Sequence, residues 1–134
     1  MLSDKKFIGI DDALKKGLEL EAYRSGGGLR FVIIRDESGT IKASSAMPNL
    51  RPALIIADLD YLAGHPDCSH SHYFTGSSQP EEALDEWILR GYKIIANIRD
   101  GKVNLEARTS KKEVVSASAN TFYESYVRLN GLMT

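Results

Sequence analysis

The chain has 134 residues, with 17 lysine and arginine residues, 18 aspartate and glutamate residues, a net charge of -1 and a hydrophobic fraction of 43%. This length predicts a single domain spanning residues 1–134, large enough to bury a substantial core. The balanced charge excludes a protein that is basic throughout, as general nucleic-acid binders are, and an acidic mimic of DNA.

The first predicted element is an amphipathic helix over residues 10–22. The apolar positions that recur at helical spacing are Ile10, Ala13, Leu14 and Leu18. Three consecutive glycines, residues 26–28, follow this helix. A glycine loop that binds phosphate lies after a strand and before a helix. Here the order is reversed, so these glycines predict a flexible connector.

A β-hairpin is predicted next, with strands over residues 29–35 and 40–45. Its four-residue loop pairs Arg35 with Thr40 and Ile34 with Ile41. Side chains alternate along a strand, and directly opposed residues share a face. The inward side chains are then Val32, Ile34, Ile41 and Ala43. The outward side chains are Phe31, Ile33, Arg35, Thr40, Lys42 and Ser44.

A helix over residues 49–63 is predicted to follow, with Asn49 as its N-cap and Gly64 after its end. Its apolar residues lie on more than one side: Leu50, Leu54, Ile55, Ile56, Leu59 and Leu62. This pattern predicts burial against the sheet and against a further surface, such as a second subunit. We therefore expect a homodimer.

The loop over residues 64–77 holds all three histidines and the only cysteine. The candidate metal ligands are His65, Cys68, His70 and His72. In an extended chain Cys68, His70 and His72 project to the same side and could present three ligands to a zinc ion. Their spacing matches no recognised zinc motif, and a solvated surface loop is the alternative. Tyr73 and Phe74 are candidates for stacking on a planar part of a ligand.

A second helix with clear end signals is predicted over residues 78–90. Ser78 and Glu81 have the spacing of a capping box, and Gly91 stands where helices prefer a terminal glycine. Its apolar stripe consists of Ala83, Leu84, Trp87 and Ile88.

A tight hairpin follows this helix, because Asp100-Gly101 is the dipeptide that a two-residue type I′ turn prefers. The turn pairs Arg99 with Lys102, and the ladder ends with Lys93 opposite Arg108. One face is apolar: Tyr92, Ile94, Ala96, Ile98, Val103, Leu105 and Ala107. The other is polar apart from Ile95: Lys93, Asn97, Arg99, Lys102, Asn104, Glu106 and Arg108.

The final predicted element is a helix from Ser110 to about residue 129, with Glu113 completing a second capping box. Its buried line is Val115, Ser118, Phe122, Tyr126 and Leu129. Because valine favours strands, a short strand around residues 114–116 before a helix at Asn120 is the alternative.

Two short strings recur in the two halves of the chain. Residues 10–14 read IDDAL and residues 80–84 read PEEAL, while Ile-Arg-Asp precedes the turn of both hairpins. We interpret this as a duplicated αββ(α) unit, residues 10–63 and 78–130, joined by the loop 64–77; chance similarity is the competing explanation. The predicted fold is α+β, a mainly antiparallel four-stranded sheet with helices packed on one face.

The outward hairpin face is the main candidate binding surface. Its cations are Arg35, Lys42, Lys93, Arg99, Lys102 and Arg108, against the single acid Glu106. Asn97 and Asn104 are directly opposed and add hydrogen-bonding groups. A positively charged sheet face suits the phosphates of a nucleotide or a nucleic acid. A solvated face and an oligomer interface are the alternatives.

We therefore predict a small, non-enzymatic binding protein that holds a phosphate-bearing ligand. The first alternative is a metal-binding protein or metal-dependent enzyme that uses the histidine and cysteine loop, and the second is a regulatory protein acting through protein contacts. A single cysteine, no apolar run of the roughly 18 residues that span a bilayer, and no signal-peptide core predict a cytoplasmic protein without a membrane partner.

Overall fold

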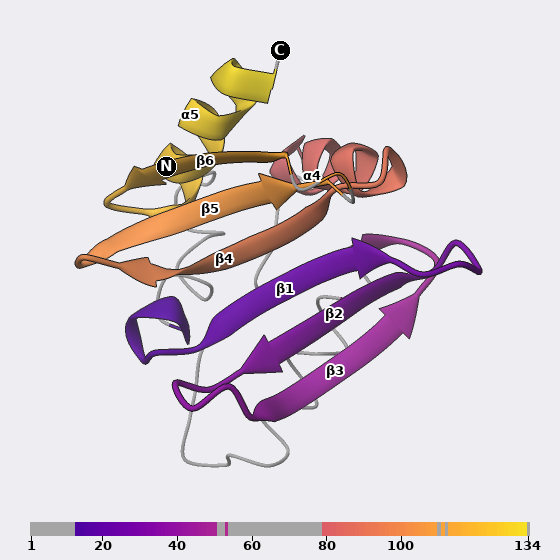
Figure 1. Cartoon of the computed structure of the whole chain (residues 1–134), viewed down its shortest axis with the longest axis horizontal. Coiled ribbons are helices and arrows are strands. Elements are labelled where there is room, and N and C mark those ends of the chain that lie inside the picture. The colour runs from indigo at the N-terminus through magenta and orange to yellow at the C-terminus, as the bar shows by residue number, and fades with distance from the viewer. Residues whose placement is uncertain (1–12, 51–52, 54–78, 110, 112, 134) are drawn as a thin grey trace.

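Six antiparallel strands form one sheet in the part of the chain that the computed structural model describes, residues 13–50, 53, 79–109, 111 and 113–133 (Figure 1). In chain order the elements are β1 (Glu19–Arg24), β2 (Arg30–Arg35), β3 (Ile41–Met47), α4 (Gln79–Leu89), β4 (Lys93–Arg99), β5 (Lys102–Arg108), β6 (Val114–Ala119) and α5 (Phe122–Met133). The predicted α+β class and antiparallel pairing are confirmed. The sheet has two strands more than the four predicted, and the duplicated unit stays a prediction.

The sheet consists of two three-stranded meanders that meet at its centre. Across the sheet the order is β3-β2-β1-β4-β5-β6, so the first strand of each half pairs with the first strand of the other. Figure 1 shows β1 and β4 side by side in the middle. In this central pair Glu21 lies directly opposite Ile95.

The chain enters β1 through a glycine that ends a helical turn. The Gly17 N–H donates to the Leu14 carbonyl at 2.9 Å, and the Leu18 N–H donates to the Ala13 carbonyl at 3.2 Å. This pair of bonds is a Schellman motif, which favours a left-handed residue, and Gly17 has a φ of 92°. The helix predicted over residues 10–22 is therefore wrong beyond this point, where strand β1 follows.

Replacing Gly17 by alanine should destabilise the protein by about 1–2 kcal/mol, because a side chain disfavours the left-handed backbone. An added Cβ atom would also lie 2.2 Å from Oε1 of Glu37, so that side chain would have to move. Urea unfolding followed by circular dichroism measures the loss. Gly26→Ala is the matched control, because nothing lies within 4 Å of its added Cβ atom. Equal losses in the two variants would contradict the prediction.

Helix α4 ends with the same motif. The Gly91 N–H donates to the Ile88 carbonyl at 3.0 Å, and the Tyr92 N–H donates to the Trp87 carbonyl at 3.1 Å. Gly91 has a φ of 100°, so its predicted place at the end of the helix is confirmed. The predicted capping box depends on Ser78, which lies outside the described residues.

The β4–β5 hairpin has the predicted turn and pairing. Asp100 and Gly101 both have positive φ, 53° and 75°, as a type I′ turn requires. Every predicted pair from Arg99 with Lys102 down to Lys93 with Arg108 is present.

The β2–β3 hairpin differs from its prediction by a β-bulge. Arg35 pairs with Ile41 and Ile34 pairs with Ala43, which leaves Lys42 as the extra residue in β3. Because Arg35 pairs with Ile41 and not with Thr40, Ile41 shares the outward face of Arg35. It is therefore not an inward residue as predicted but is 53% exposed.

Strand β6 occupies residues that were predicted as the start of the last helix. The prediction of a helix from Ser110 is wrong there, and its alternative, a short strand before a later helix, is confirmed. The cap of α5 is Thr121, whose Oγ1 accepts the Glu124 N–H at 3.1 Å. Thr121 and Glu124 have the same spacing as the predicted capping box of Ser110 and Glu113.

The core lies on one face of the sheet, and both α4 and α5 contribute to it. Its largest fully buried side chains are Phe122, Leu14, Ile34, Ile88, Leu105, Leu129 and Val32. Leu50 and Ala53, the buried residues described from the helix predicted over residues 49–63, belong to the same cluster. The other face of the sheet is therefore where the predicted basic residues are to be found.

Candidate functional site

The sheet face away from the core, here called the polar face, holds most of the predicted ligand-binding residues. The members that the strand registers place on it are Arg35, Lys93, Asn97, Arg99, Lys102, Asn104 and Arg108. Lys42 is the bulged residue of the edge strand β3 and lies 3.7 Å from the Asp36 carboxylate. Tyr73 and Phe74 lie outside the described residues.

Strand β1 adds two carboxylates to the polar face that were not predicted there. Glu19 lies opposite Arg35, and Glu21 is buried between the two halves of the sheet. Glu21 forms ion pairs with Lys93, at 2.7 Å, and with Arg35. The alternation Leu-Glu-Leu-Glu-Ala-Tyr over residues 18–23 has the period of a strand and could have revealed both.

The environment of Glu21 favours its charged form. Burial by itself raises the pKa of this carboxyl, but hydrogen bonds from Lys93 and Arg35, together with their positive charges, outweigh burial and leave the pKa below its usual value. Glu21 is therefore a fixed negative charge that neutralises part of the predicted basic surface.

A line of hydrogen bonds crosses four strands of the polar face. Asn97 donates to Glu19 at 3.0 Å, Asn104 donates to Asn97 at 3.4 Å, and Ser118 donates to Asn104 at 3.0 Å. The two asparagines, predicted to orient a ligand, thus have their amide groups engaged with neighbouring strands.

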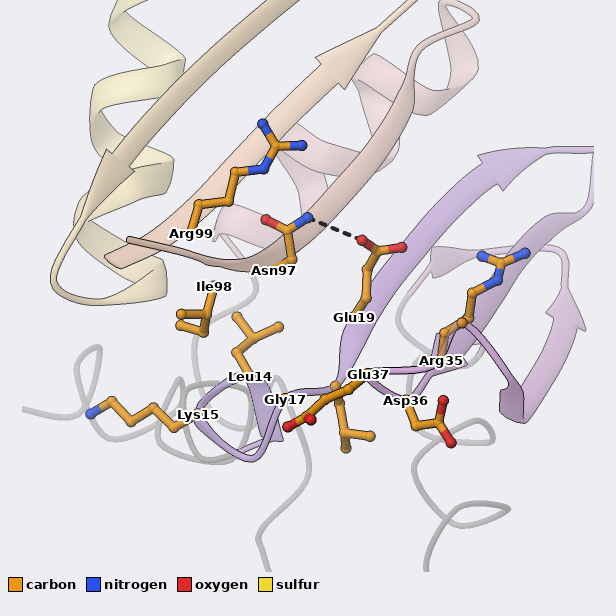
Figure 2. Close-up of a pocket in the computed structure, with 12 residues that line it drawn as sticks. Leu14, Lys15, Gly17, Glu19, Arg35, Asp36, Glu37, Asn97, Ile98 and Arg99 are labelled. Atoms are coloured by element: carbon orange, nitrogen blue, oxygen red, sulfur yellow. Dashed lines mark hydrogen bonds between the residues drawn. The ribbon is translucent and has the colours of Figure 1, made fainter. Parts of the chain in front are cut away.

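The larger of two pockets at the ends of β1 and β4, the Arg99 pocket, has a volume of about 530 Å³ (Figure 2). Its lining residues are Leu14, Lys15, Gly17, Leu18, Glu19, Arg35, Asp36, Glu37, Gly39, Asn97, Ile98 and Arg99. Figure 2 shows Glu19 between Asn97 and Arg35, with Glu37 beside Gly17. Three cations face three carboxylates here, so the pocket has no excess of either charge.

The smaller pocket, the Arg108 pocket, has a volume of about 350 Å³. Its lining residues are Tyr23, Arg24, Gly91, Tyr92, Lys93, Arg108 and Thr109. These include three cations and no carboxylate. Arg24, Tyr23 and Tyr92 were missed as site residues, because Arg24 and Tyr23 fell at or beyond the end of a predicted helix and Tyr92 on the apolar face of a hairpin.

Contacts with neighbouring residues orient the cations of the Arg108 pocket. The Lys93 ammonium lies 5.3 Å from the centre of the Tyr23 ring, within range of a cation–π interaction. Arg24 donates to the Leu89 carbonyl at 3.1 Å, and Arg108 pairs with Glu106.

No family model, curated protein or solved structure matches this chain. What the two pockets bind is therefore argued from their own residues.

Metal binding has no support among the residues that the structure describes, where no group of three or more His, Cys, Asp or Glu could hold an ion. The predicted ligands His65, Cys68, His70 and His72 lie outside those residues. In the same part of the chain, no helix combines the length and apolar character needed to cross a membrane.

Proposed function

We propose that the protein is a small, non-enzymatic binding protein that holds a phosphate-bearing ligand, with the phosphate in the Arg108 pocket. The observation that carries this proposal is the charge of the pocket wall. Arg24, Lys93 and Arg108 line it without any carboxylate. A wall of this kind favours an anion, and guanidinium groups match the geometry of phosphate oxygens.

The three cations keep donors for a ligand after their own contacts are made. A guanidinium has five N–H donors and an ammonium has three. The contacts described use one N–H of Arg24, at Leu89, and one N–H of Arg108, at Glu106. Lys93 uses one N–H at Glu21, at 2.7 Å. Glu21 and Glu106 are buried and hold Lys93 and Arg108 in place. The pocket thus offers donors that are already oriented, which lowers the entropy cost of binding.

Two aromatic rings favour a nucleotide over a bare phosphate. Tyr23 and Tyr92 line the same pocket, and Tyr23 is held by an edge-to-face contact with Phe31 at 5.4 Å. Tyrosine rings provide a surface on which a base stacks. A volume of about 350 Å³ lies within the roughly 300–1,000 Å³ range of small-molecule sites. We therefore favour a mononucleotide-sized ligand.

The double variant Arg24→Gln/Arg108→Gln should weaken binding of adenosine 5′-monophosphate at least 30-fold, because two charge-assisted hydrogen bonds, worth about 1.5–3 kcal/mol each, are lost. Isothermal titration calorimetry at low salt measures the change. The affinity of the wild-type protein for adenosine 5′-monophosphate should fall steeply as salt is added. It should also exceed the affinity for inorganic phosphate.

The control is Lys16→Gln/Lys102→Gln, which removes the same charge at exposed positions outside the Arg108 pocket. Its affinity should stay within twofold of wild type. A larger loss of affinity in the control would indicate that the nucleotide binds at the Asp100-Gly101 end of the sheet. Absence of nucleotide binding at millimolar concentration would contradict the proposal.

The alternatives stay predictions. The metal-binding alternative depends on the loop 64–77, which lies outside the described residues. The regulatory alternative and the homodimer depend on the helix predicted over residues 49–63, of which the described residues Leu50 and Ala53 belong to the core. Elemental analysis and light scattering of the purified protein test them.

A further inference from the structure

The two pockets lie at opposite ends of a locally symmetric strand pair. Gly17 and Gly91 each end a helical turn with the same pair of bonds, two residues before β1 and β4 begin. Glu21 and Ile95 lie four residues after these two glycines and are directly opposite each other in the central strand pair. A two-fold rotation about that point exchanges β1 with β4.

The register on either side follows the same rotation. Leu20 pairs with Ala96 and Ala22 pairs with Ile94, as a two-fold axis through the central pair requires. The strand order is symmetric about the same point, with one meander on each side. The rotation therefore superimposes one end of the polar face on the opposite end.

Every lining position of the Arg108 pocket has its counterpart in the Arg99 pocket under this rotation. The rotation matches the segment before each strand, residues 91–93 with residues 17–19. It matches the end of β5 with the end of β2, so that Arg108 and Thr109 take the places of Arg35 and Asp36. It also matches the end of β1 with the end of β4, so that Tyr23 and Arg24 take the places of Asn97 and Ile98. The correspondence of the arginines follows from their strand partners, Lys93 in one case and Glu19 in the other. The two pockets are thus the same structural site with different side chains.

The side chains of the Arg99 pocket give it a different charge from that of the Arg108 pocket. Glu19 stands where the other pocket has Lys93, and Asp36 stands where it has Thr109. Asp36 is used within its own turn, accepting the Ser38 N–H at 2.9 Å and the Thr40 N–H at 3.0 Å.

The remaining charges of the pocket are of both signs. Arg35 is held by Glu21. Among the described residues, Lys15, Glu37 and Arg99 have no ion-pair partner, and the contact of Glu19 with Asn97 uses only its Oε2 atom. A purely anionic ligand would meet the free carboxylates, and a purely cationic one would meet the free cations.

We infer that the Arg99 pocket is a second binding site and that it takes a free α-amino acid. Its carboxylate pairs with Arg99, whose guanidinium forms two parallel hydrogen bonds with such a group. Its ammonium group pairs with the carboxylate of Glu19, which points to the same side of the pocket as Arg99 (Figure 2). A pocket of about 530 Å³ leaves space for a side chain. This site is separate from the one proposed for phosphate.

Ligand-observed NMR with an equimolar mixture of the twenty standard L-amino acids tests the inference. At least one amino acid should bind. The amine that lacks its carboxylate and the acid that lacks its amino group should each bind at least tenfold more weakly. The inference would be overturned if none of the twenty amino acids bound, or if the amine or the acid bound as tightly as the whole amino acid.

Variants locate the site. Arg99→Gln and Glu19→Gln should each weaken binding of the amino acid at least tenfold. Lys102, the strand partner of Arg99, lies outside the pocket, so Lys102→Gln should leave the affinity within twofold. Arg24→Gln/Arg108→Gln should also leave it unchanged. Competition between adenosine 5′-monophosphate and the amino acid would place both in one pocket and refute a second site. Failure of nucleotide binding alone would refute only the proposed function.

Discussion

Replacing Phe122 by alanine should lower the free energy of unfolding by about 3–5 kcal/mol, the usual cost of removing a buried aromatic side chain. Phe122 is 1% exposed at the start of α5. It meets residues of β1, α4 and β4 around a void of only about 10 Å³. A core filled to this density cannot close over the missing ring, so most of the cavity should remain. Guanidinium unfolding followed by tryptophan fluorescence measures the loss.

Val127→Ala is the control on the same helix, because Val127 is about half exposed. Its effect should stay within about 0.5 kcal/mol, as for other surface substitutions. A loss below 1 kcal/mol for Phe122→Ala would contradict the packing described here.

The second large effect is expected for Glu21→Gln, which should destabilise the protein by about 2–3 kcal/mol at pH 7. Breaking a buried ion pair costs about 3–5 kcal/mol, and we expect less because Lys93 and Arg35 are 42% and 28% exposed. The variant leaves both cations facing an uncharged amide at the centre of the sheet. Urea unfolding of both proteins measures the difference.

The pH dependence identifies the charge as the cause. Because the folded protein holds the pKa of Glu21 below its usual value of 4.5, the carboxylate stabilises the fold fully above that value and loses this contribution as the pH falls through the lowered pKa. The gap between wild type and Glu21→Gln should therefore be constant from pH 7 to about pH 5 and should shrink below 4.5. A gap that stays the same down to pH 3 would show that packing, not charge, explains the loss.

Glu86→Gln is the matched control for Glu21→Gln. Glu86 pairs with Arg90 on the surface of α4, and both side chains are more than half exposed. Exposed pairs one helical turn apart contribute about 0.3–0.5 kcal/mol. The control should therefore change stability little at any pH.

Local sequence signals predicted the β4–β5 hairpin and the end of α4. Asp100-Gly101 determines both the turn and the register, because only residues that tolerate positive φ suit a type I′ turn and a one-residue slip would bury the charges. Gly91 ends α4 for a similar reason. In such segments the contacting residues are close in the chain, so their chemistry alone is decisive.

Where the predictions failed, another signal of equal local strength was available. Leu14 and Leu18 fit a helix, but the left-handed Gly17 between them ends it. Two capping boxes compete near the C-terminus, and Thr121 with Glu124 caps α5 because β5 recruits the preceding residues as strand β6. A local glycine signal ended the first helix, whereas tertiary pairing overrode helix periodicity in the second place.

Taken by itself, the sequence determined the α+β class, one hairpin register and a sheet surface rich in basic residues. Only the tertiary structure decided that β1 lies in the middle of that surface, where Glu21 binds both Arg35 and Lys93. The physical reason is that strand pairing between distant segments depends on backbone groups that every residue has, so no local pattern specifies it. The two pockets and their different charges follow from that pairing, because each is lined by residues from both halves of the chain.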